Sequence, residues 1–143
     1  MTQANHPDVS IGKLLRTTFA KYHRLLVDQV HEAGFSDLTP AQAEVIALID
    51  ADPIKAIDLA ARAEVSKQAM SLLTAELVRK DYLEQYADPQ DGRAKLLKLS
   101  ERGRHLKQAG QDAKTIAERK LLSKLDDRET QALIDYLLRA LAD

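Results

Sequence analysis

Apolar residues recur at three- and four-residue steps over three long stretches of the chain, which is the pattern of amphipathic helices. The first stretch runs from Ile11 to Val30, and Gly34 is well placed to end it. The second begins at Ser100 or Glu101 and reaches about Ser123, and a capping box of Asp126 with Glu129 starts the third. The pattern predicts a mostly helical protein.

The region between these stretches predicts shorter helices. Thr39 is the expected N-cap of a helix whose capping box is completed by Gln42, with Pro40 at its first position. After Asp52-Pro53, a very short strand or turn leads into a helix at about residues 57 to 63. Ser66 caps the next helix, KQAMSLLTAELVRK. Two short helices joined by about three residues are typical of a helix-turn-helix.

A hairpin follows, with strands expected at residues 82–87 and 95–99. Pro89 favours a turn, and Asp91-Gly92 is a pair that tolerates left-handed backbone angles, so we expect a tight hairpin with Arg93 at its tip. A guanidinium on such a thin projection suits a narrow DNA minor groove. The alternative is that Asp91 and Arg93 only stabilise the turn by an ion pair.

The helix after Ser66 has one apolar side, containing Met70 and Leu77, and one polar side. On the polar side Gln68 can form a bidentate contact with adenine, and Lys67 can reach guanine or a phosphate. Leu72 either contacts a thymine methyl or rests on the hairpin. Lys98 and Arg102 are further candidates for phosphate contacts. The residues that we predict to bind DNA are Ser66, Lys67, Gln68, Ser71, Leu72, Asp91, Arg93 and Lys95.

Composition narrows the class of protein. The 143 residues suit a single domain, and the absence of cysteine excludes disulfides and thiolate catalysis. We find no signal sequence, no membrane-spanning stretch, no phosphate loop and no catalytic motif, so we expect a cytoplasmic protein that is not an enzyme and needs no cofactor. The net charge is −1, but residues 62–107 contain ten bases and seven acids, an excess of +3 around the hairpin.

The terminal helices carry apolar stripes that the small central region cannot cover. Pairing with a second copy of the chain would cover them, whereas packing within one chain is the alternative. His23 and His31 lie on roughly one helix face beside Glu32, so a metal or anion site is conceivable, but interfacial histidines explain them more simply and we predict no metal site.

The motifs LTPAQAEVIALI, LAARAEVSKQAMSLLTAELVRKDYLEQ and DPQDGRAKLLKLSERG occur in an order that resembles the MarR family of bacterial transcriptional regulators over nearly the entire chain. The most specific match is the D-P-x-D-x-R hairpin followed by L-[ST]-x-x-G. The resemblance implies a winged helix-turn-helix lobe at residues 36–103 and dimerisation helices at residues 1–35 and 104–143. It also implies a homodimer that binds a near-palindromic operator on double-stranded DNA, most often as a repressor.

The resemblance further implies a small anionic or phenolic effector, for which Tyr22, His23 and His31 are candidate contacts. Four residues depart from the family pattern. Glu64 and Asp81 stand at positions where glycine is frequent, and Leu72 and Gln85 stand where arginine is frequent. The absence of these two arginines weakens the expected binding to DNA phosphates. The alternative function is therefore a winged-helix protein that has lost tight DNA binding and acts as a protein-interaction module.

Overall fold

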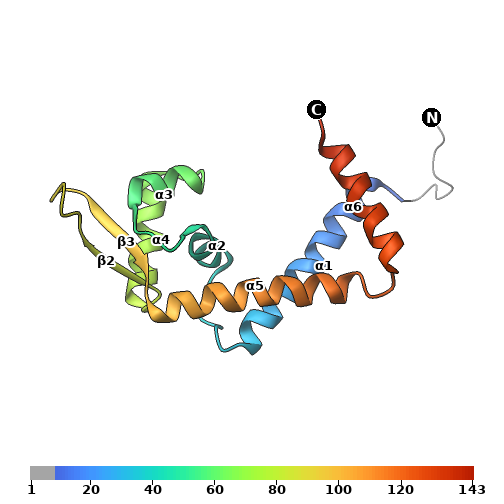
Figure 1. The fold of residues 1–143 in the computed structure, drawn as a ribbon, viewed down its shortest axis with the longest axis horizontal. Coiled ribbons are helices and arrows are strands. Elements are labelled where there is room, and N and C mark those ends of the chain that lie inside the picture. The colour runs from blue at the N-terminus through green and yellow to red at the C-terminus, as the bar shows by residue number, and fades with distance from the viewer. Residues whose placement is uncertain (1–8) are drawn as a thin grey trace. The chain divides into compact units, whose positions relative to one another are not determined.

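A computed structural model describes residues 9–143 and confirms a mostly helical fold with one small sheet (Figure 1). The chain divides into two compact units. A central unit spans Val30–Asp112, and a terminal unit combines residues 9–29 with Ala113–Asp143. In chain order the elements are α1 (Ile11–Glu32), α2 (Pro40–Leu48), β1 (Ile54–Lys55), α3 (Ala56–Arg62), α4 (Lys67–Arg79), β2 (Leu83–Ala87), β3 (Lys95–Leu99), α5 (Glu101–Leu121) and α6 (Asp127–Leu141).

The predicted helix caps are confirmed. The Thr39 hydroxyl accepts from the Gln42 backbone N–H at 3.2 Å, while the Gln42 side chain accepts from the Thr39 N–H at 3.1 Å. Asp126 and Glu129 form the same reciprocal pair at the start of α6. Each cap satisfies backbone donors that a helix leaves unpaired in its first turn, so these boundaries are set locally.

The sheet is antiparallel with strand order β1-β3-β2, and it anchors the helix-turn-helix to the hairpin. The very short strand expected before α3 is β1, in which Ile54 pairs with Leu97 of β3. The inward side chains of Ile54, Leu83 and Leu97 are buried in one core with residues of α2, α3, α4 and the start of α5. This core fixes how α4 and the β2–β3 hairpin lie within the central unit.

Three helices end in the same way, with a residue at positive φ. Gly34 has φ 99° after α1, Glu64 has φ 55° after α3, and Asp81 has φ 65° after α4. After α3, the Val65 N–H donates to the Ala60 carbonyl at 3.1 Å and the Glu64 N–H to Ala61 at 3.2 Å. This is the Schellman pattern, in which the left-handed position favours glycine. Glu64 and Asp81 therefore occupy positions that glycine would fill without strain.

The loop of the hairpin differs from the predicted tight Asp-Gly turn. Gly92 does not have a positive φ, so the expected left-handed pair is wrong. Instead, two successive turns link Asp88 to Asp91 and Asp91 to Ala94 through backbone hydrogen bonds of 3.2 and 2.9 Å. Asp88 Oδ1 accepts from the Gln90 N–H, and Asp91 Oδ1 from the Arg93 N–H at 3.1 Å. These side-chain bonds stabilise the loop without left-handed geometry.

The junction between the hairpin and α5 depends on close backbone contact. The Ser100 N–H donates to the Tyr82 carbonyl at 3.0 Å, and the Ser100 hydroxyl accepts from the Gly103 N–H at 3.0 Å. A Cβ on Gly103 would lie 2.1 Å from the Tyr82 carbonyl oxygen, well inside van der Waals contact. Glycine is therefore required at 103, which explains its place in the motif that follows the hairpin.

Candidate nucleic-acid interface

Helix α4 presents the polar face that the sequence predicted. Ser66 caps it, its hydroxyl accepting from the Ala69 N–H at 3.1 Å, and the side chains of Lys67, Gln68 and Ser71 are exposed. The opposite face buries Met70 and Leu77 in the core. Burial of one face fixes the rotation of the helix about its axis, so the polar face points away from the protein.

Thr74, which the sequence did not single out, is buried on α4. Its hydroxyl donates to the Met70 carbonyl at 2.9 Å, and this bond to the preceding turn satisfies its polar atom. A small cavity of about 160 Å³ lies between this part of α4 and the hairpin, lined by Ala56, Ser71, Thr74, Ala75, Gln85, Lys95 and Leu97. Ser71 and Lys95 therefore face a common space, although they lie on different elements.

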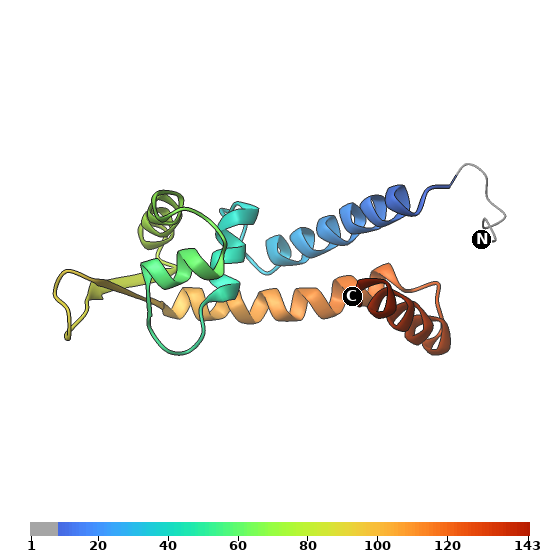
Figure 2. The ribbon, with the colours of Figure 1, turned by 90° about the horizontal axis from the view of Figure 1, so that it is seen from above.

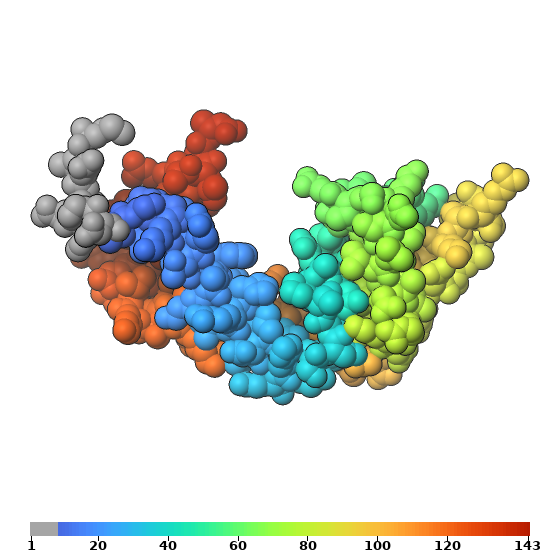
Figure 3. Space-filling view, turned by 180° about the vertical axis from the view of Figure 1, so that it is seen from behind, coloured from blue at the N-terminus to red at the C-terminus, as the bar shows by residue number. Residues whose placement is uncertain are grey.

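The β2–β3 hairpin extends beyond the helices of the central unit (Figures 2 and 3). Arg93 lies in its loop with an exposed side chain, and within residues 9–143 its guanidinium forms no hydrogen bond or ion pair. The predicted alternative, an ion pair between Asp91 and Arg93, is absent from the described residues, since the Asp91 carboxylate accepts a hydrogen bond from the Arg93 backbone N–H and does not pair with the guanidinium. The Arg93 guanidinium is thus available to an external anion.

Other charged side chains of the hairpin form ion pairs within the sheet region. Asp88 is buried at the base of the loop, 3.8 Å from Lys55 of β1, and Lys98 of β3 pairs with Glu84 of β2 at 3.1 Å. The first pair links β1 to the loop that follows β2, and the second links the neighbouring strands β2 and β3. Lys95, by contrast, is exposed next to the loop and has no partner among the described residues.

A polar cluster joins the end of α4 to the start of α5 and to the loop before α2. The Tyr82 hydroxyl donates to Asp37 Oδ1 at 2.6 Å, and Arg102 donates to Asp37 Oδ2 at 3.3 Å and to the Lys80 carbonyl at 2.8 Å. Arg102 also lies over the Tyr82 ring, 4.3 Å from its centroid. Arg102, expected as a phosphate contact, is therefore engaged within the central unit.

This cluster shifts two pKa values. The hydrogen bond from Tyr82, followed by the nearby Arg102, lowers the pKa of Asp37 below its usual value. Burial, followed by the hydrogen bond to Asp37, raises the pKa of Tyr82 to about 12. The tyrosine thus stays protonated and the aspartate ionised over the physiological range, so the bond persists. Tyr82 and Arg102 lie 45 and 65 residues from Asp37 in the sequence, and no local pattern indicated these contacts.

The candidate effector residues lie on α1, and the structure does not bring all three together as a closed site. Tyr22 and His23 are half-buried in the terminal unit, and the His23 ring lies 6.3 Å from that of Phe19. Burial, followed by the charge of Glu118, raises the pKa of Tyr22. His31 is exposed, near the end of the helix. Residues 9–143 contain no group of three or more His, Asp or Glu side chains arranged to hold a metal ion.

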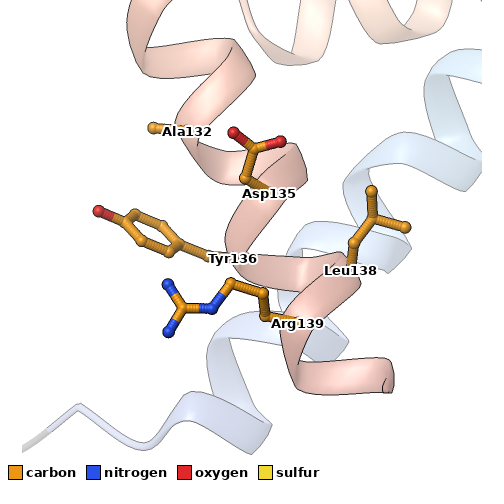
Figure 4. A pocket seen from close by; sticks show the side chains of 5 residues that line it. All are labelled: Ala132, Asp135, Tyr136, Leu138 and Arg139. Atoms are coloured by element: carbon orange, nitrogen blue, oxygen red, sulfur yellow. The ribbon is translucent and has the colours of Figure 1, made fainter.

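The terminal unit leaves much apolar surface open. Neither α1 nor α6 has a fully buried residue, and several large apolar side chains on them are exposed: Ile11, Leu14, Leu15, Phe19, Ile134, Leu138 and Leu141. A hollow of about 490 Å³ is lined by α6 residues alone, Ala132, Asp135, Tyr136, Leu138 and Arg139 (Figure 4). Because one helix supplies the whole lining, the hollow is open surface rather than an enclosed site. Within residues 9–143, no helix combines the length and the apolar character needed to span a bilayer.

The sequence of the central region matches the MarR family over residues 36–94. No curated protein matches the chain at a significant level. Among solved structures, the reduced form of MarR from E. coli is 25% identical with a TM-score of 0.77, covering 94% of this chain and 98% of that one. A probable transcriptional regulator from Pseudomonas aeruginosa is 27% identical with a TM-score of 0.69 and the same coverage.

A mutant MarR from E. coli complexed with operator DNA is 25% identical, with a TM-score of 0.71, and covers 99% of this chain and 100% of that one. The family match falls on the helix-turn-helix and on β2 and the loop of the hairpin, and the structural matches extend over nearly the whole chain, terminal helices included. Residues 36–94 therefore match the MarR family, and the chain has the winged-helix fold of MarR-family transcriptional regulators.

Proposed function

We propose that the protein is a homodimeric repressor that binds a near-palindromic operator on double-stranded DNA. The observation that carries the proposal is the combination of the exposed polar face of α4 with the unpartnered Arg93 guanidinium on the hairpin. A major groove admits a helix, and an adjacent minor groove admits an arginine on a thin projection. The complex of E. coli MarR with operator DNA supports this proposal by analogy.

The proposed contacts divide by chemistry. Gln68 and Ser71 contact base edges, Lys67 contacts a base or a phosphate, and Ser66 positions the first turn of α4, where backbone N–H groups favour a phosphate. Arg93 enters the minor groove and Lys95 binds phosphate, while Asp91 holds the loop that carries Arg93. These roles assign residues 36–103 to the DNA-binding lobe.

The dimer is proposed from the apolar surface of α1 and α6. A second copy would bury these stripes by twofold symmetry, so residues 1–35 and 104–143 are the proposed dimerisation segments. Two symmetric lobes would then reach half-sites about 34 Å apart, one turn of DNA. Phe19→Asp tests this directly, because an aspartate in an apolar interface should yield monomers in sedimentation velocity.

Leu72→Asp is the matched control for the dimer, since Leu72 is as exposed as Phe19, 68% against 66%, but lies on α4. It should leave the dimer intact. Monomers of the unsubstituted protein at micromolar concentration, or an intact Phe19→Asp dimer, would contradict the proposed interface.

Selection from a random pool of duplex DNA tests the function itself. The proposal predicts an enriched near-palindrome whose binding is weakened by Gln68→Ala but not by Gln131→Ala, a glutamine on α6 that pairs with Asp135 at 3.0 Å. Enrichment of no sequence would instead favour the alternative, a winged-helix protein that has become a protein-interaction module. That result would agree with Leu72 and Gln85 standing where the family often has arginine.

We further propose that a small anionic or phenolic effector releases the DNA and that the protein acts in the cytoplasm, without enzymatic activity. The half-buried Tyr22 hydroxyl and His23 ring supply hydrogen-bonding groups beside the aromatic surface of Phe19, while His31 is a more exposed candidate. Salicylate is a suitable probe. It should raise the melting temperature and weaken operator binding in the unsubstituted protein, and both effects should diminish in His23→Ala.

A further inference from the structure

Leu72 is the most exposed large apolar side chain of residues 36–103. Its exposed fraction is 68%, against 51% for Ile57, the next in this region. It belongs neither to the core cluster nor to the side chains packed against that cluster. It also does not line the cavity between α4 and the hairpin. The alternative expected from the sequence, that Leu72 rests on the hairpin, therefore does not hold, and the side chain is left for an external partner.

The neighbours of Leu72 define what that partner is. Gln68 lies one helical turn before it and Ala75 nearly one turn after it, and both are exposed on the same side of α4 as Ser71. Leu72 is thus at one edge of the face proposed to enter the major groove, on the side next to Gln68. It has no group that can bind a phosphate or hydrogen-bond to a base, so only an apolar contact would benefit from its presence there.

The major-groove edge of DNA offers one apolar group, the C5 methyl of thymine. We propose that Leu72 is a specificity-determining residue that contacts this methyl group in each half-site, an inference that rests on the proposed DNA-binding function. One helical turn is about 5.4 Å, and base pairs are stacked about 3.4 Å apart. The thymine therefore lies within about two base pairs of the base that Gln68 reads. Cytosine at this position lacks the methyl group and exposes an amino group to the leucine side chain.

The test replaces each thymine of the selected operator by deoxyuridine, which removes only the methyl group. For the unsubstituted protein, one position per half-site should weaken binding about fourfold, the ratio that corresponds to burial of one methyl group, and about fifteenfold when both half-sites are changed. Leu72→Met should keep this discrimination because its side chain remains long and apolar. Leu72→Ser should bind thymine and uracil equally, while Ile57→Ser, the matched exposed position, should discriminate as the unsubstituted protein does.

The outcomes separate the two proposals. Operator binding with no uracil-sensitive thymine, or with a sensitivity that persists in Leu72→Ser, overturns the role of Leu72 and leaves DNA binding in place. Failure of the selection to enrich any operator overturns the proposed function, and the role of Leu72 falls with it. Because Leu72 is outside the core, circular dichroism of the Ser and Met variants should match that of the unsubstituted protein.

Discussion

The positive φ of Glu64 predicts that replacing it with glycine stabilises the protein. A side chain in the left-handed region costs roughly 1 to 2 kcal/mol, and Glu64 is held at φ 55° by the two hydrogen bonds that end α3. Glycine removes this cost. It also gives the unfolded chain more conformational entropy, which lowers the free energy of unfolding by about 0.4 to 1 kcal/mol. The expected net gain for Glu64→Gly is therefore about 0.5 to 1 kcal/mol.

Two controls isolate the backbone effect. Glu64→Gln keeps the Cβ and removes only the negative charge near the end of α3. Because a negative charge is unfavourable at the C-terminus of a helix, the free energy of unfolding should rise by about 0.3 kcal/mol. Asp81→Gly, at φ 65°, should gain less than Glu64→Gly, because aspartate tolerates this region better than glutamate does. The stability gained by each glycine variant should therefore be larger where the replaced residue tolerates the left-handed region less well.

Thermal unfolding at one fixed protein concentration measures these differences, since the stability of a dimer depends on concentration. For a chain of this size, 1 kcal/mol corresponds to roughly 3 °C in Tm. If Glu64→Gly melts at no higher a temperature than Glu64→Gln, the backbone at residue 64 is not strained. The inference that glycine would be favoured at this position is then refuted.

Three further predictions concern α5 and the residues around its start. Gly103→Ala should lower the free energy of unfolding by about 2 to 3 kcal/mol, because the new Cβ would lie 2.1 Å from the Tyr82 carbonyl oxygen. Gly110 has open space around it, so Gly110→Ala should raise the free energy of unfolding by about 0.5 to 1 kcal/mol. Urea titrations measure both changes. The raised pKa of Tyr82 implies stability that is present below pH 10 and lost as pH rises toward 12, so the melting temperature should fall over this window in the unsubstituted protein and fall less in Tyr82→Phe. The lowered pKa of Asp37 implies stability that is present above its unfolded value of 3.8 and lost on further acidification, and Asp37→Asn should remove that acid dependence.

Local signals in the sequence were sufficient for most of the fold. The caps at Thr39, Ser66 and Asp126 and the strand at residues 95–99 depend on neighbouring residues and were predicted correctly. The turn around Gly92 was not, because an Asp-Gly pair fits several turn types and the side-chain bonds of Asp88 and Asp91 select among them.

The polar contacts between distant segments could not be predicted. Nothing in the sequence distinguished Arg102, which binds Asp37 and Lys80, from a free phosphate-binding charge. Similarly, the polar face of α4 was evident from its periodicity, but whether Leu72 was open or covered depended on where the hairpin lies. The DNA-contact residues themselves remain predictions until binding is measured.

Binding of the selected operator by Arg93→Ala tests the central claim most directly. Arg93 is exposed and without a partner in the described chain, so its removal should leave circular dichroism and the oligomeric state unchanged. We predict a loss of about 1 to 3 kcal/mol in binding free energy and a flatter dependence of affinity on salt, with no loss in Arg119→Ala, which removes the same charge from α5. Equal affinity of Arg93→Ala and the unsubstituted protein would contradict the account, because the hairpin would then have no part in holding DNA.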